Sequence, residues 1–101
     1  VERGVQYKLL VNISTDFDED QVEEIQWAFM DAVEEISNSS KENIVTNQTM
    51  DYLLWCDPSK YDKSSKVYRY LKKAFINAET EGTLRKMNVN RKMVMLKVDY
   101  E

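Results

Sequence analysis

Residues 5–36, VQYKLLVNISTDFDEDQVEEIQWAFMDAVEEI, decide the first half of the fold. Over the first nine positions large apolar side chains alternate with mostly polar ones, which is typical of a strand with one buried face. Leu10 is the exception, because its place in the alternation puts it on the other face. The helical spacing of a second apolar set then predicts a helix that ends in the polar run 37–40; this set is Val22, Ile25, Phe29, Ala32, Val33 and Ile36.

The start of this helix carries its own signals. Asp18 is a good N-cap residue, and Gln21 stands at the position that completes a capping box. Phe17 is placed to pack on Val22 across the first turn as a hydrophobic staple. The sequence therefore predicts a first helix fixed at its N-terminal end.

The rest of the chain predicts more strands and a second helix. Residues 42–46 and 50–56 read as two strands around a turn at 47–48, although 52–56 also fit a buried helical turn. After a break at 57–59, a helix is expected from about 62 to 80, with Gly82 as its stop. Its apolar face consists of Val67, Leu71, Ala74, Phe75 and Ala78. Residues 84–89 and 92–100 look extended, and a turn at 88–91 can join them as a hairpin whose inward side chains are Val94, Leu96 and Val98.

This order predicts one α+β domain over residues 1–101, either a whole protein or one domain of a longer chain. We expect two helices packed on one face of a four- or five-stranded antiparallel sheet, in a ferredoxin-like split β-α-β topology. That topology serves many unrelated functions, so it indicates none of them.

Composition argues against catalysis and against a bound cofactor. The chain is 43% hydrophobic and 32% charged, as in ordinary globular domains, and no apolar run is long enough to span a bilayer. It has no histidine, the commonest general base and metal ligand, so we expect a non-enzymatic protein without cofactor or metal. Residues 16–20 resemble the start of a calcium-binding loop, but Gln21 and Trp27 stand where the loop requires Gly and a bidentate Glu.

Cys56 is the single cysteine, and no cationic neighbour in the sequence lowers its pKa. We therefore expect a buried, inert thiol and an intracellular protein. Three glycosylation acceptor patterns, at Asn12, Asn38 and Asn47, keep an extracellular location open as the alternative.

Charge is divided unevenly along the chain. The net charge is −4, yet residues 1–58 hold 3 basic and 13 acidic side chains, whereas residues 59–101 hold 11 basic and 5 acidic ones. Either the acidic and basic halves neutralise each other across neighbouring surfaces, or their charges attract charged partners or a second copy in a head-to-tail arrangement.

Trp27 is the residue that the domain's own core explains least. At 100° per residue it lies about 160° from Phe29, the centre of the buried stripe of the first helix. It shares that outer side with carboxylates, and tryptophan is enriched among interface hot spots. The sequence thus predicts a protein-partner site made of Trp27, Met30, Glu23, Asp31 and Glu34. Two alternatives remain: Trp27 packs under the N-terminal arm or a loop, or the acidic helix mimics a nucleic acid and acts as an inhibitor.

The basic half predicts a different function. Cations and interleaved tyrosines can hold a phosphate backbone and stack on bases. This nucleic-acid site consists of Lys66, Arg69, Lys72, Lys73, Arg85 and Arg91, and its plainer alternative is a solvated helix face. Finally, Leu10, one side of residues 50–56, Met93 and Met95 are expected on the sheet face away from the helices, where they either fill gaps in the core or form a homodimer or partner surface.

Overall fold

The computed structural model of the chain describes residues 4–80 and 82–100. Strands and helices follow in the order β1 (Val5–Ile13), α1 (Glu19–Ile36), β2 (Ser37–Val45), β3 (Thr49–Cys56), α2 (Ser64–Ala78), β4 (Thr83–Val89) and β5 (Met93–Asp99). The prediction of an α+β domain with two helices and up to five strands is confirmed. Residues 52–56 are strand rather than a helical turn, because their side chains alternate between buried and half-buried. No helix in the described part of the chain is long and apolar enough to cross a membrane.

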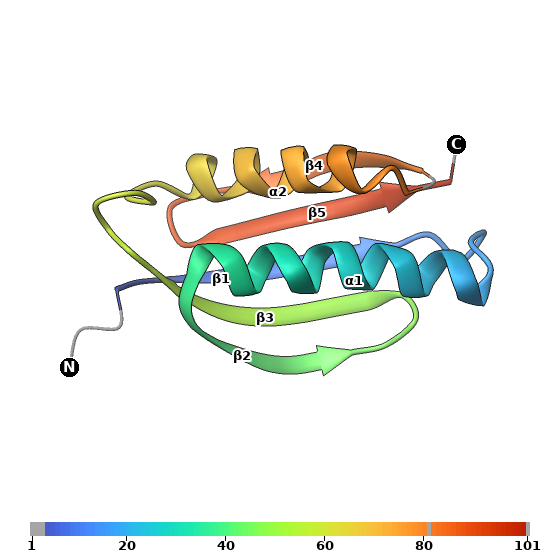
Figure 1. Cartoon of the computed structure of the whole chain (residues 1–101), viewed down its shortest axis with the longest axis horizontal. Helices are drawn as coiled ribbons and strands as arrows, with labels where there is room; N and C mark the ends of the chain where they lie inside the picture. Colours follow the sequence, from blue (N-terminus) through green and yellow to red (C-terminus); the bar gives the residue numbers. More distant parts are fainter. Residues whose placement is uncertain (1–3, 81, 101) are drawn as a thin grey trace.

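The five strands form one mixed sheet in the order β2-β3-β1-β5-β4 (Figure 1). Three neighbouring pairs are antiparallel, but β1 and β5 run parallel, so the prediction of a purely antiparallel sheet is wrong. The ferredoxin-like order is not confirmed either, because the chain after α2 forms the β4–β5 hairpin and its second strand lies beside β1. Burial accounts for this choice: β5 buries Val94, Leu96 and Val98 in the core, whereas Leu84 is the one buried residue of β4, which stays at the edge.

Helix α1 begins as its sequence predicts. The Asp18 carboxylate accepts a hydrogen bond from the Gln21 backbone N–H at 2.8 Å, and the Asp18 N–H donates to Gln21 Oε1 at 3.0 Å. The two bonds satisfy amides that otherwise lack partners in the first turn. The helix ends at Ile36, and Ser37 enters β2 directly, so this strand starts five residues before the predicted position 42.

Helix α2 ends differently from the prediction. It stops at Ala78 because Glu79 adopts a left-handed conformation with φ of 56°, so Gly82 is not its stop. Gly82 instead leads into β4 with φ of +101°, where a Cβ atom would come within 2.6 Å of the Phe17 ring. At its other end, the Ser64 hydroxyl donates a hydrogen bond to the Asn90 carbonyl in the β4–β5 turn. The hairpin is thereby tied to the first turn of the helix.

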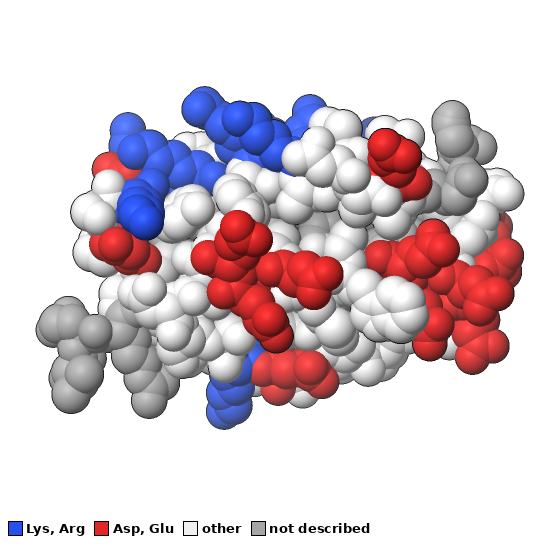
Figure 2. Space-filling model, in the orientation of Figure 1, with Lys and Arg blue, Asp and Glu red and all other residues white. Residues whose placement is uncertain are grey.

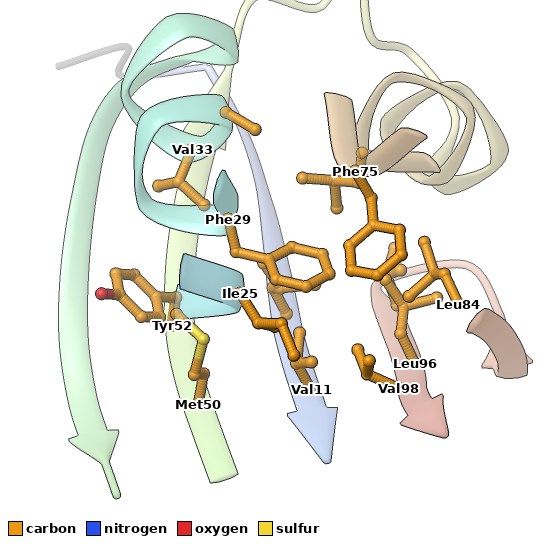
Figure 3. Packing of buried hydrophobic residues seen from close by; sticks show 14 of the residues in the cluster. Val11, Ile25, Phe29, Val33, Met50, Tyr52, Phe75, Leu84, Leu96 and Val98 are labelled. Carbon is orange, nitrogen blue, oxygen red and sulfur yellow. The ribbon is translucent and has the colours of Figure 1, made fainter. Parts of the chain in front are cut away.

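Both helices cover the same face of the sheet, and the core lies between the two layers (Figure 1). Phe29 of α1 and Phe75 of α2 stack with ring centroids 5.8 Å apart where the helices meet (Figure 3). Below them, strand side chains at alternate positions complete the core; they are Tyr7, Leu9, Val11, Ile13, Met50, Tyr52, Leu54, Cys56, Leu84, Val94, Leu96 and Val98. The opposite face of the sheet is covered by neither helix.

Candidate functional site

The outer side of α1 presents the five residues predicted to bind a protein partner. Their spacing along the helix places all of them within one stripe centred on Trp27, with Glu23, Met30, Asp31 and Glu34 around it. Trp27 is 56% exposed, so the alternative in which a loop covers this side chain is not supported for the described loops. Met30 differs from the others because it is half-buried and packs against the core.

The carboxylates of this stripe have no ion-pair partner among residues 4–80 and 82–100. Among the described residues, none of the salt bridges involves a carboxylate of α1, and none joins α1 to α2. Glu35 lies outside the stripe and contacts the hydroxyl of Tyr70: the pKa of Tyr70 is raised first by burial and then by the charge and hydrogen bond of Glu35. The stripe therefore presents uncompensated negative charge around an exposed indole.

Charge is segregated on the helical face of the molecule. Figure 2 shows Asp and Glu gathered over α1 and at the end where α1 begins, and Lys and Arg gathered along α2. The two halves that the sequence distinguishes thus lie side by side, since α1 packs against α2. Because no described ion pair bridges the two helices, they do not neutralise each other by direct contact.

The structure brings together only part of the predicted nucleic-acid set. Lys66, Arg69, Lys72 and Lys73 are all exposed on α2. Lys66 is already paired with Asp62, with Nζ and Oδ1 2.8 Å apart. Arg85 points to the opposite face of the sheet and binds Asp99 at 3.0 Å, while Arg91 lies in the β4–β5 turn.

Lys86, which is outside the predicted set, belongs to the basic helical side. Its Nζ lies 5.8 Å from the centre of the Tyr68 ring of α2, within cation–π range. The strand register also places it opposite the buried Leu96 and therefore on the helix side of β4. Tyr68 is the residue in the sequence that could have pointed to Lys86, because a nucleic-acid site combines cations with aromatic rings.

The uncovered face of the sheet carries the apolar residues expected there. Leu10 of β1 lies between Asp51 of β3 and Met95 of β5, and Lys8 lies between Leu53 and Met93 in the same way. Trp55 lies on the same face of β3, opposite Gln6. Apart from the exposed Lys8 and Gln6, these side chains are half-buried, as expected when large groups on an open sheet cover one another. One shallow hollow of about 410 Å³ on this face is lined by Gln6, Lys8, Leu53 and Lys92.

Cys56 is buried, and burial raises the pKa of its thiol to about 11. A neutral thiol enclosed in the core is a poor nucleophile. Among the described residues, no cluster of three His, Cys, Asp or Glu side chains is arranged to hold a metal ion. Comparison of the chain with protein-family models, with curated proteins and with solved structures gave no match in any of the three.

Proposed function

We propose that the chain is a non-enzymatic binding module that docks a basic surface of a protein partner on the α1 stripe. The observation that carries this proposal is the 56% exposure of Trp27 at the centre of carboxylates that have no ion-pair partner in the described part of the chain. Moving a large exposed indole from water into a pocket of a partner lowers the free energy of the complex, and tryptophan is among the commonest hot-spot residues.

The charge around Trp27 defines the chemistry of the partner. Glu23, Asp31 and Glu34 are all exposed, and the stripe from Glu23 to Glu34 spans about 16 Å of helix. The matching surface is an apolar pocket for the indole ringed by Lys and Arg side chains. Opposite charges accelerate the encounter and fix its orientation, whereas the indole supplies most of the affinity.

The helix holds this stripe in one conformation before a partner arrives. Its N-terminal end is fixed by the Asp18–Gln21 capping box, and its inner side is anchored by buried residues such as Ile25 and Phe29. A rigid recognition helix loses little conformational entropy on binding. The surface is therefore suited to rigid docking.

A nucleic acid bound along α2 is the second candidate function. Arg69, Lys72 and Lys73 take part in no ion pair among the described residues, and Lys86 joins them from β4 over the Tyr68 ring. Against it, a polyanion on α2 lies beside the carboxylates of α1, which repel it. We also infer that a protein which itself binds nucleic acid is one class of basic partner for α1, as the inhibitor alternative requires.

The test compares two exposed apolar side chains on the two helices. Trp27→Ala removes the proposed anchor, and Ile76→Ala is the matched control, because Ile76 is 60% exposed on α2. A purified partner is expected to bind the wild type and Ile76→Ala equally and to bind Trp27→Ala about 30-fold more weakly, which corresponds to about 2 kcal/mol. The free energy of unfolding should change by less than about 1 kcal/mol in either variant.

A second pair of variants separates the two candidate functions. A Glu23→Lys/Asp31→Lys/Glu34→Lys variant should lose a basic partner, whereas Arg69→Glu/Lys72→Glu/Lys73→Glu should retain it. The opposite result, together with affinity for a single-stranded oligonucleotide that falls steeply with salt, would establish nucleic-acid binding through α2 and contradict the α1 proposal.

A further inference from the structure

The uncovered sheet face is a large apolar surface that the α1 proposal does not use. Leu10, Leu53 and Trp55 lie on it next to Met93 and Met95, since the registers of β1 with β3 and of β1 with β5 bring these strands together. The helices pack on the other face alone (Figure 1). Outward positions of a sheet face that meets water are usually polar. An apolar centre on such a face is typical of a surface that is covered in the functional state.

We propose that this face is covered by the same face of a second copy of the chain, which gives a symmetric homodimer with two stacked sheets inside and the helices outside. The inference is independent of the α1 stripe, which stays exposed on the outside of the dimer. A face that packs on itself is the commonest arrangement in homodimers, because it satisfies both copies at once.

The charges on this face permit a second copy, although they do not select it. Three cations on this face are paired within the protomer: Lys8 lies 3.6 Å from Asp51, Lys97 lies 3.5 Å from Asp99, and Arg85 also binds Asp99. Lys41, opposite Leu53 in the β2–β3 register, and Lys92 in the hollow take part in no ion pair among the described residues. The face therefore carries a net positive charge, and because Lys41 and Lys92 are exposed, we expect their long side chains to reach solvent at the rim of the dimer. Stacking two copies leaves the internal pairs intact.

The area of the face is sufficient for this role. Its five strands are seven to nine residues long. At about 3.3 Å per residue and about 4.8 Å between strands, the face covers roughly 600 Å². Two of them bury roughly 1,200 Å², the lower end of the range for a specific stable interface.

Ile44 extends the apolar surface toward the β2 edge. It is paired with Asp51 in the β2–β3 register and is 54% exposed. An exposed isoleucine at this position is explained if a second sheet packs over it, about 10 Å above the first. The predicted apolar patch on residues 10, 53, 93 and 95 thus continues to an edge strand.

The test is the oligomeric state of the chain by sedimentation equilibrium from about 1 to about 500 µM. We expect a reversible dimer of the 12.0 kDa chain, with Leu53→Glu and Met95→Glu each giving folded monomers. Ile76→Glu is the matched control on α2 and should remain dimeric, as should Trp27→Phe. Circular dichroism of each variant separates loss of the dimer from loss of the fold.

Two further measurements decide the mode of association. In Trp27→Phe, Trp55 is the remaining tryptophan, and its emission should shift to shorter wavelength as the concentration rises into the dimer range. The dimer should persist at high salt, because apolar groups hold it. A wild type that stays monomeric throughout would overturn the proposal, and so would a dimer that high salt or Glu23→Lys dissociates, because that result indicates head-to-tail contact between the charged helices.

Discussion

The buried thiol of Cys56 makes the stability of the protein sensitive to alkaline pH by a predictable amount. Burial raises the pKa of this thiol from its ordinary value of 9.0 to about 11. Between these two values the unfolded chain releases the proton while the folded chain keeps it. The stabilisation is therefore complete below pH 9 and is lost as the pH rises toward 11. For Cys56 alone, the loss at pH 10 is about 1.4 kcal/mol of unfolding free energy.

Urea unfolding of the wild type and of Cys56→Ala, followed by tryptophan fluorescence at pH 8 and pH 10, measures this quantity. The variant loses some packing energy at both pH values, so that cost cancels in the comparison. Tyrosines of raised pKa, including Tyr52 at about 12, lower the stability of both proteins at high pH. The wild type should lose about 1.4 kcal/mol more than the variant between the two pH values. Equal losses would refute the claim that the folded chain keeps Cys56 protonated.

Three substitutions test the structural framework of the α1 stripe, each by urea unfolding. Asp18→Ala removes the capping box and should cost about 1 kcal/mol, whereas Asp20→Ala in the same turn should cost less than about 0.5 kcal/mol; equal costs would contradict the cap. Gly82→Ala places a Cβ 2.6 Å from the Phe17 ring and 2.8 Å from a backbone oxygen, so we expect a loss above about 2 kcal/mol, and a neutral effect would show that the backbone shifts freely. Phe29→Ala opens a cavity between the helices and should cost about 3–5 kcal/mol; a cost below about 1 kcal/mol would exclude the observed packing.

The sequence predicted the local features of the fold well because they depend on near neighbours. The capping residues of α1, its buried stripe and the exposure of Trp27 all follow from helical periodicity over residues 18–36. The inward side chains of β5 follow in the same way from alternation. What alternation does not contain is the identity of the neighbouring strand, so the parallel pairing of β1 with β5 could not be predicted.

The division of the predicted basic set also has a physical cause. β4 carries an irregularity between Lys86 and Asn88, which lets both Leu84 and Val89 face the helices although an odd number of positions separates them. Strict alternation counted from Leu84 places Arg85 on the uncovered face, whereas the same count from Val89 places it on the helix side. The position of the bulge decides between the two, and the sequence does not show it. The sequence thus predicted which residues are basic, but not that Arg85 is paired with Asp99 on the uncovered face.

The parallel pair at the centre of the sheet has a consequence for how the chain reaches its fold. Lys8 pairs with Met93 and Ile13 with Val98, so the central joint of the sheet closes between segments about 85 residues apart. Pairing of two segments so far apart in the sequence costs chain entropy before the stabilising contacts form, and this slows folding. On a ribosome, β1 through β3 can assemble with α1 while β1 still has an open edge and an apolar side. That edge is protected once β5 has been synthesised, so the intermediate most exposed to aggregation is the chain that lacks its last strand.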